Sequence, residues 1–392
     1  MGIIMAKIRR ATVLDDLPDC IVVQEILARL PPKDVLRCRA VCKSWRGATS
    51  THKFMLDNCR RQPSLPLIKQ DILGQTGVSF LVFRDDCAGS SNQKLWPIIH
   101  DSKLHQLLGA CDGLVILSDR SDFWICNPAT HKYSPLPQPR VPSSSSGGSS
   151  IYIAGFYRHH PSGEYRVLWF SDGHPTYVLT VGSDEPRIIR RPPMTPSLPE
   201  HGPPRSLHSC YSLQVNHRDS LHWLTRRYAK TAEDIMVFDT VAETFRWIRS
   251  PDQLGILVSL LEIDGKLASC SSYGTIIDVW VMQDYEAEDW ALKYRIDLLA
   301  MPLPWFALPE LLYISNMALL NHRELLICNS MSSRRPDCLV HCDIDGKLIG
   351  YFKIKEGNHT IYFTNQYFQE SIIPLPFSEM QEDKEPPFFI GL

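Results

Sequence analysis

The stretch EIDGKLASC (residues 262–270) places an Asp-Gly pair between two short aliphatic runs. Asp-Gly in this position favours a tight turn between antiparallel strands, because both residues tolerate the positive φ angles that such a turn needs. Related units with a polar turn ahead of an aliphatic strand are ACDGLVIL (110–117), NHRDSLHWL (216–224), NHRELLICN (321–329) and CDIDGKLIG (342–350). The sequence therefore predicts repeated β-hairpins.

Several of these hairpins are followed by an aromatic strand, a polar turn and a second aromatic position. Such units are FWICNPATHKY (123–133), IMVFDTVAETFRWI (235–248) and IDVWVMQDYEAEDW (278–290). Asp219 and Asp264 are 45 positions apart, and Phe238 and Trp280 are 42 positions apart. A period of about 40 to 50 residues with about four strands in each repeat is typical of a β-propeller. Most of the tryptophans are expected in the cores of its blades.

The propeller is expected over residues 64–376, followed by an acidic tail at 377–392. Units around 78–108 and 151–170 fit the repeat less closely, so the sequence predicts five to seven blades. The Ser-Gly run 141–150 and the proline-rich run 190–206 are expected as surface loops, since neither composition can build a packed core.

A helical segment is predicted ahead of the propeller, over residues 12–60, after a disordered stretch at 1–11. Apolar residues recur at helical spacing between Pro18 and Leu30, and the Pro31-Pro32 pair ends this helix. The apolar residues of this face are Val22, Val23, Ile26, Leu27 and Leu30. A second helix is predicted from Pro32 onward, with Val35, Cys38, Cys42 and Trp45 on one side. The segment is expected to form two or three short helices.

The segment LPDCIVVQEILARLPPKDVLRCRAVCKSWRGATSTHKF (17–54) resembles the F-box, with a Leu-Pro start, an Ile-Leu-x-x-Leu-Pro centre and a Val-Cys-Lys-x-Trp end. The rest of the chain is similar to the plant F-box-associated, kelch-like β-propeller. That second resemblance rests on Asp112-Gly113-Leu114, on Asn127-Pro128 and on the terminal element with Tyr367, Glu370 and Ser371. The resemblance implies an α+β multidomain chain, with a small helical F-box followed by a large all-β propeller.

The resemblance also implies a function, namely the substrate-recognition subunit of a Skp–cullin–F-box ubiquitin ligase. Such a subunit is not an enzyme and is expected to need no cofactor. It binds a Skp-type adaptor through the F-box and a target protein through the propeller. The residues at the motif positions for the adaptor are Leu17, Pro18, Ile26, Leu27, Leu30, Pro31, Val41 and Trp45. Independently, a helical segment this small cannot bury so many apolar groups, so part of them is expected to face a partner.

Charge does not single out nucleic acid as a partner. The chain has 41 Lys and Arg against 43 Asp and Glu. A basic run nevertheless follows the apolar cluster, with Lys33, Arg37, Arg39, Lys43, Arg46, Lys53, Arg60 and Arg61. Solvated helix surface is the simplest interpretation. A nucleic-acid-binding regulator that uses this run at 33–61 is an alternative, although no base-reading motif accompanies it.

Catalytic and metal-binding patterns are weak. Cys338-x-x-His341-Cys342 is the densest Cys and His group, but in a strand His341 points away from the two cysteines, so no metal site is expected. The twelve cysteines are otherwise expected as scattered, buried apolar residues. His159, His160, His217 and His322 fall in turn-like contexts and are expected in solvent. A propeller lectin or hydrolase with a helical cap stays an alternative, but no catalytic residues are identified.

The target-binding residues cannot be fixed from the sequence. Trp305, in a proline-flanked insertion, and Arg190 and Arg191, beside a long loop, are candidates because binding residues often lie on loops of a rigid scaffold. The chain shows no signal-peptide pattern at its start and no apolar run that approaches the ~18 residues of a membrane span. The nucleus or the cytoplasm is therefore expected, rather than secretion.

Overall fold

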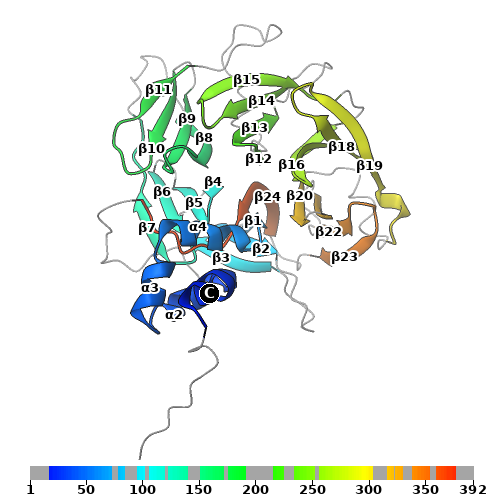
Figure 1. Ribbon diagram of the computed structural model, residues 1–392. Coiled ribbons are helices and arrows are strands. Elements are labelled where there is room, and N and C mark those ends of the chain that lie inside the picture. Colours follow the sequence, from blue (N-terminus) through cyan, green and yellow to red (C-terminus); the bar gives the residue numbers. More distant parts are fainter. Residues whose placement is uncertain are drawn as a thin grey trace, which may run out of the picture.

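The structure is a computed structural model, which places a group of helices beside a ring of β-sheets (Figure 1). It describes residues 17–72, 78–83, 95–101, 106–119, 122–139, 151–171, 175–190, 215–224, 234–251, 256–302, 316–321, 323–329, 338–353 and 359–376. The stretches expected as a disordered start (1–11), a Ser-Gly loop (141–150) and an acidic tail (377–392) lie outside these residues, as does 191–206 of the proline-rich run.

The helical region (residues 17–61) begins with a single run of helix. Its elements are α1 (Asp19–Ile21), η2 (Val22–Ile26), η3 (Leu27–Arg29), α2 (Pro32–Cys38), α3 (Lys43–Thr49) and α4 (His52–Arg61). The first three follow one another with α, π and 3₁₀ geometry, which confirms a helix here that ends at Arg29, one residue before the predicted Leu30. Pro31 is extended and Pro32 opens α2, as the fixed φ angle of proline favours.

The predicted second helix is wrong in its extent. α2 ends at Cys38, and Cys42 has an extended backbone with φ −153° and ψ 162°. The Cys42 sulfur caps α3 by accepting the backbone N–H of Trp45 at 3.4 Å. Val35 and Trp45 therefore lie on different helices. Cys42 is exposed, and its sulfur caps the start of α3 and does not pack in the core.

The apolar spacing did not predict α4, which carries much of the core of the helical region. Thr51 caps this helix, since its Oγ1 accepts the N–H of Phe54 at 3.3 Å. The buried Asn58 side chain donates hydrogen bonds to the carbonyls of Ala28 and Leu30 at 3.2 and 2.9 Å. These bonds tie α4 to the end of η3.

In the described residues, 24 strands form six four-stranded antiparallel sheets, numbered here as blades (Figure 1). Given from the inner to the outer strand, blade 1 is β24 (His359–Phe368), β1 (Leu65–Ile72), β2 (Val78–Phe83) and β3 (Leu95–Asp101). Blade 2 is β4 (Gln106–Cys111), β5 (Leu114–Asp119), β6 (Asp122–Asn127) and β7 (Lys132–Pro135). Blade 3 is β8 (Ile151–Arg158), β9 (Tyr165–Ser171), β10 (Thr176–Thr180) and β11 (Arg187–Ile189).

The second half of the chain supplies the other three blades. Blade 4 is β12 (Val215–His217), β13 (Ser220–Leu224), β14 (Asp234–Asp239) and β15 (Thr244–Arg249). Blade 5 is β16 (Ile256–Ile263), β17 (Lys266–Tyr273), β18 (Ile276–Asp284) and β19 (Asp289–Asp297), followed by the short helix η5 (Leu298–Ala300). Blade 6 is β20 (Asn316–Asn321), β21 (Glu324–Asn329), β22 (Cys338–Asp343) and β23 (Leu348–Lys353). The propeller is confirmed, and its blade number is six.

The ring is closed by pairing the last strand with the first. β24 pairs antiparallel with β1, from Leu65 opposite Phe368 to Ile72 opposite His359. β24 also lies beside the inner strands β4 and β20 of the neighbouring blades. This pairing joins the first and the last strand of the propeller in one blade and so closes the ring.

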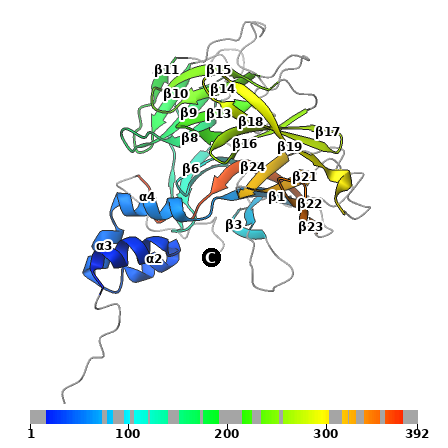
Figure 2. The ribbon, with the colours of Figure 1, turned by 45° about the vertical axis from the view of Figure 1, so that its right-hand side comes forward.

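Antiparallel strand order gives the propeller two different faces. The turns from first to second strand and from third to fourth strand lie on one face, here called the hairpin face. β1 is a second strand, so it starts on the hairpin face, and the helical region that precedes it lies there (Figure 2). β24 is a first strand and ends on the same face. The opposite face carries the second-to-third turns and the connections between blades.

Positive φ angles confirm the Asp-Gly turns. Asp264 and Gly265, between β16 and β17, have φ angles of 51° and 70°. Asp112 and Gly113, between β4 and β5, have φ angles of 49° and 79°. Two successive positive φ angles match the twist of the flanking strands, which is why Asp-Gly marks these hairpins in the sequence.

The β8–β9 hairpin presents two tyrosine–arginine pairs to its neighbours. Tyr157 lies opposite Arg166, and Arg158 lies opposite Tyr165. The first pair binds a carboxylate of blade 4, that of Glu243. The Tyr157 hydroxyl donates a hydrogen bond to Glu243 at 2.9 Å, and the Arg166 guanidinium donates one to Glu243 at 2.7 Å. Arg187 of β11 also binds Glu243.

The second pair bonds a carboxylate of blade 2. The Tyr165 hydroxyl and the Arg158 Nε each lie 3.1 Å from Asp112 Oδ2. Burial is the main cause that raises the pKa of Tyr165, with the Asp112 carboxylate adding to it. Blade 3 is therefore held by ionic hydrogen bonds on both sides.

The blade cores are aromatic, and one core continues into the helical region. Trp169 and Trp223 are fully buried, as expected from the repeat. A single buried apolar cluster contains Val22, Leu27, Val35 and Phe54 together with residues of blades 2 and 3. The helical region thus packs on the propeller.

Candidate functional site

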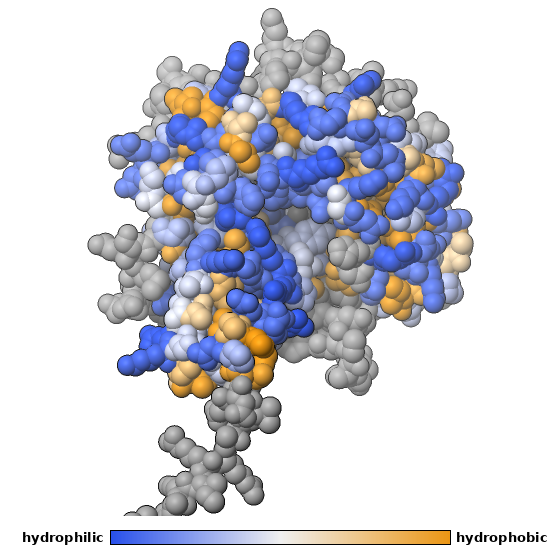
Figure 3. Space-filling view, in the orientation of Figure 1, coloured by the Kyte–Doolittle hydropathy of each residue, from blue (hydrophilic) through white to orange (hydrophobic). Residues whose placement is uncertain are grey.

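The helical region exposes apolar side chains away from its core. Ile21, Ile26 and Leu36 are 43%, 37% and 37% exposed, and Val41 is 65% exposed. Figure 3 shows hydrophobic residues gathered at the lower end of the helical region. Exposure of large apolar residues close together typically marks a surface for a protein partner.

The eight residues predicted to bind the adaptor differ in their exposure to solvent. Pro18, Ile26, Pro31 and Val41 are exposed. Leu17, Leu30 and Trp45 are half-buried and pack against the core cluster. Leu27 is only 2% exposed, so its side chain forms part of that core. The four exposed residues are therefore the accessible part of the predicted set.

Trp45 has a structural role in addition to its exposed part. Its backbone N–H is held by Cys42, and its carbonyl accepts a hydrogen bond from the buried Thr49 hydroxyl at 2.7 Å. The Thr49 carbonyl also accepts a hydrogen bond from Arg39 Nη2 at 2.7 Å. The bonds with Cys42 and Thr49 use backbone atoms of Trp45, whereas its half-buried side chain packs against the core cluster, so a substitution at Trp45 would alter that packing as well as the surface.

Ile21 and Leu36 are exposed apolar residues that the motif did not identify. Each precedes or follows a buried residue of the core face, Val22 and Val35 respectively. The signal that could have found them is the helical angle: a residue one position from a core residue is rotated by about 100° and points out of the core. Packing in the core does not account for the apolar side chains of Ile21 and Leu36 at these outward-facing positions.

The basic run lies mostly in solvent, as expected of helix surface. Arg39 is half-buried and the other seven residues are exposed. Arg37 pairs with Asp34 at 2.9 Å, and Arg61 donates to the Gln24 carbonyl at 3.3 Å. Some of the positive charge therefore serves local helix contacts.

The residues predicted for the target are only partly described. Arg190 is exposed and directly follows β11, so it lies on the face opposite the helical region. Arg191 and Trp305 lie outside the described residues.

No metal site is found in the part of the chain that the structure describes, where no group of three potential ligands occurs. His341 is fully buried, and its Nε2 lies 2.7 Å from Glu324 Oε2. Nor is any helix in the described ranges sufficiently long and apolar to span a bilayer. The expectation that all cysteines are buried is wrong, since Cys20 and Cys42 are exposed.

His217 is buried, which corrects its expected place in solvent. It is 5% exposed, and its Nδ1 lies 2.9 Å from Glu262 Oε2 of blade 5. His222, beside it, lies 2.7 Å from the Tyr285 hydroxyl. Burial lowers the pKa of His222 to about 4, so the ring is neutral near pH 7. The cluster joins blades 4 and 5.

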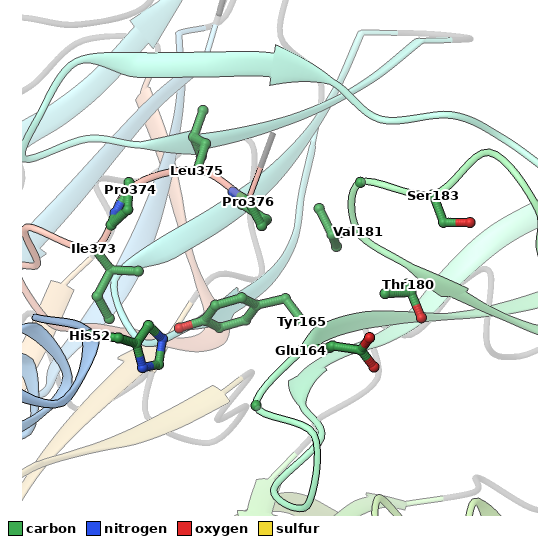
Figure 4. A pocket seen from close by; sticks show the side chains of 12 residues that line it. His52, Glu164, Tyr165, Thr180, Val181, Ser183, Ile373, Pro374, Leu375 and Pro376 are labelled. Atoms are coloured by element: carbon green, nitrogen blue, oxygen red, sulfur yellow. The ribbon is translucent and has the colours of Figure 1, made fainter. Parts of the chain in front are cut away.

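A cavity of about 530 Å³ lies where the helical region, blade 3 and residues 373–376 meet. Figure 4 shows the Tyr165 ring between His52 of α4 on one side and Val181 on the other. Ile373, Pro374, Leu375 and Pro376 form a further wall. The lining mixes polar and apolar groups and is shared by three parts of the chain.

Comparison with known proteins agrees with this architecture. The chain matches the F-box domain over residues 14–57 and the F-box associated beta propeller domain over residues 80–375. The second match covers more than half of the chain. The protein therefore belongs to the F-box proteins with an F-box associated β-propeller.

Curated proteins that are similar to this chain include F-box proteins of Arabidopsis thaliana. F-box protein At5g18160 is 25% identical over 281 residues, covering 69% of this chain and 67% of the relative. Putative F-box protein At4g21240 is 25% identical over 326 residues, covering 76% of this chain and 70% of the relative. Among solved structures, TolB from Acinetobacter baumannii aligns with a TM-score of 0.45 and 8% identity, over 83% of this chain and 73% of that protein.

Proposed function

We propose that the protein is the substrate receptor of a Skp–cullin–F-box ubiquitin ligase. The observation that carries this proposal is the set of exposed apolar residues on the helical region, namely Ile21, Ile26, Leu36 and Val41. They lie on a domain whose family is defined by the F-box. The helical region would bind a Skp-type adaptor, and other subunits of the ligase would carry out the chemistry.

The packing of the helical region supports this assignment. Its core residues Val22, Val23 and Val35 are buried by contacts within this chain. The exposed apolar residues named above are not part of that buried core. Large apolar side chains that the fold does not need are the residues expected to dominate binding to an adaptor.

The propeller would hold the target protein, with no cofactor. In this proposal the domains are residues 12–60 and 64–376. The face opposite the helical region is the proposed target side, because the connections between blades lie there and leave room for variable loops. Arg190 stands on that face, and Arg191 and Trp305, which lie outside the described residues, stay candidates from the sequence alone. The ligase would act in the nucleus or the cytoplasm.

Capture of the full-length chain by a Skp-type adaptor tests the proposal. Val41→Asp and Ile26→Asp place a charge at exposed positions, so they leave the core intact. Binding is expected to weaken at least about tenfold, since loss of a central apolar contact costs more than ~1.4 kcal/mol. Leu30 and Trp45 are less suitable, because both are half-buried.

Val241→Asp is the matched control, because Val241 is 43% exposed on the propeller and the same charge is introduced. It should bind the adaptor as the wild type does. Unchanged capture of both Val41→Asp and Ile26→Asp would contradict the proposed adaptor surface.

A further inference from the structure

The chain continues beyond β24 as the C-terminal segment (Gln369–Pro376), which lies between the propeller and the helical region. Ser371, Ile372 and Ile373 are buried, with exposed fractions of 0%, 3% and 1%. On the hairpin face this segment contacts blade 2 with one side and α4 with the other. The contacts on the two sides differ in kind.

On the blade 2 side, the Asn127 side chain provides the polar contacts. Its Nδ2 donates to the carbonyls of Ser371 and Ile373 at 3.0 and 2.8 Å. Its Oδ1 accepts the N–H groups of Ala129 and Thr130 at 3.0 and 3.3 Å. One fully buried amide thus holds its own turn with the oxygen and the C-terminal segment with the nitrogen.

The equivalent turns of two other blades separate these two tasks. In blade 4, Asp239 Oδ1 accepts the N–H groups of Val241 and Ala242, both at 2.8 Å. In blade 5, Asp284 Oδ1 makes the same pair of contacts at 2.9 and 3.0 Å. A carboxylate therefore suffices for the turn. Only the contact with the C-terminal segment needs the donor that asparagine adds.

Gly113 allows the segment to lie directly on the β4–β5 turn. A Cβ atom at Gly113 would lie 2.3 Å from the Ser371 Cβ and 2.6 Å from the Gln369 carbonyl oxygen. Only a residue without a side chain fits at this distance. The backbone of the segment is therefore pressed against blade 2.

On the helical side, the contacts reach α4 and the residue after it. Gln369 Nε2 donates to the Gln62 carbonyl at 3.1 Å. The Cys59 thiol of α4 is fully buried, and burial raises its pKa to about 12. Ile373 shares one buried cluster with Phe54 of α4. The helical region thus rests on the C-terminal segment.

We propose that Asn127 is a positioning residue that, through the C-terminal segment, fixes the orientation of the helical region on the propeller. Loss of the two Nδ2 bonds releases the segment from blade 2 and loosens α4, while the blade itself stays folded. The consequence for ubiquitin transfer, a fixed distance between adaptor and target, rests on the proposed function. The proposed positioning of the helical region by Asn127, here called the latch, does not rest on the proposed function.

The test is hydrogen exchange on the full-length chain, comparing Asn127→Asp with the reciprocal control Asp239→Asn. Asn127→Asp keeps the oxygen that holds the turn and removes the donor. Amides of α4 and of Ser371–Ile373 should exchange at least about tenfold faster, as expected for local opening, whereas Ala129 and Thr130 stay protected. Asp239→Asn keeps its turn acceptor and should leave α4 unchanged.

Unchanged amide exchange in α4 of Asn127→Asp would overturn the proposal. Loss of amide protection throughout blade 2 would also overturn it, because that result would show that Asn127 only stabilises its own blade. Gln369→Ala removes a contact on the helical side without placing a charge in the core, and it should speed exchange at the last turn of α4. Adaptor capture by Asn127→Asp should equal that of the wild type. Failure of the wild type itself to bind the adaptor would contradict the proposed function, not the latch.

Discussion

A single carboxylate, Glu243, joins blade 4 to three side chains of blade 3. Its side chain is 8% exposed, and it accepts hydrogen bonds from Tyr157, Arg166 and Arg187. Because the acceptor is ionised and two donors are charged, these bonds are of the strong, charge-assisted kind. They add a polar contact to the apolar cluster in which Tyr157 of blade 3 packs with Trp223 and Phe238 of blade 4.

Glu243→Gln should therefore lower the stability of the propeller by about 2–3 kcal/mol, the usual range for losing hydrogen bonds to a charged group. Asp345→Asn is the matched control: the Arg323–Asp345 ion pair is 63% and 59% exposed, so its loss should cost less than about 1 kcal/mol. Denaturant unfolding followed by tryptophan fluorescence measures both changes. Equal effects of the two variants would show that the Glu243 contacts add nothing to blade packing.

The same residue makes stability depend on pH. Burial acts to raise the pKa of Glu243, but the hydrogen bonds from Arg187, Arg166 and Tyr157 outweigh burial and hold the pKa below its ordinary value of 4.5. A carboxyl with a lowered folded-state pKa stabilises the fold above its unfolded-state pKa, and this contribution disappears as the pH falls through the folded-state pKa.

The stability difference between the wild type and Glu243→Gln should thus be constant from pH 7 to about pH 5 and should decline below about pH 4. Thermal unfolding of both proteins across this range measures it. A difference that stays constant down to pH 3 would mean that the carboxylate charge is not what binds blade 3.

The sequence predicted the turn residues but not these ionic contacts. Asp112 was recognisable in an Asp-Gly turn because turn chemistry is local. Its bonds to Arg158 and Tyr165 were not, because they depend on how neighbouring blades dock. The same holds for Asn127, whose contact with Ser371 spans 244 positions.

At the scale of elements, the hairpin turns differ in what surrounds them. Gly265 and Gly113 both have positive φ, but a Cβ at Gly265 would meet nothing within 4 Å, whereas a Cβ at Gly113 would meet Ser371. Gly265→Ala should cost about 1–2 kcal/mol, the strain of a left-handed residue. Gly113→Ala should cost a further 1–3 kcal/mol or so from overpacking. Denaturant unfolding of the two variants measures the difference, and equal losses would show that the C-terminal segment moves aside freely.

The helices show why element boundaries were harder to predict than elements. Cys42 starts α3 as an N-cap, a position in which Ser, Thr, Asp or Asn is more usual, so the apolar pattern suggested one helix where there are two. Thr51, by contrast, is a typical cap, and with buried Phe54, Leu56 and Cys59 behind it α4 could have been recognised.

At the scale of the whole molecule, the repeat predicted the propeller but not its six blades. Insertions of unequal length between blades blur the period, and blade 1 is assembled from both ends of the ring-forming chain. The motif positions were enough to name candidate adaptor residues, and their role stays a prediction. Which of them are accessible was not, because Leu27 and Val41 differ only in how the helices pack, with exposed fractions of 2% and 65%.

The pairing of β1 with β24 also has a consequence for synthesis. Thr364 of β24 donates a hydrogen bond to the Leu67 carbonyl of β1, across 297 positions. At about 5–20 residues per second, β1 would leave the ribosome roughly 15–60 seconds before its partner strand. During that interval the inner edge of blade 1 lacks its native neighbour, and we expect the nascent chain to depend on chaperones until the last strand arrives.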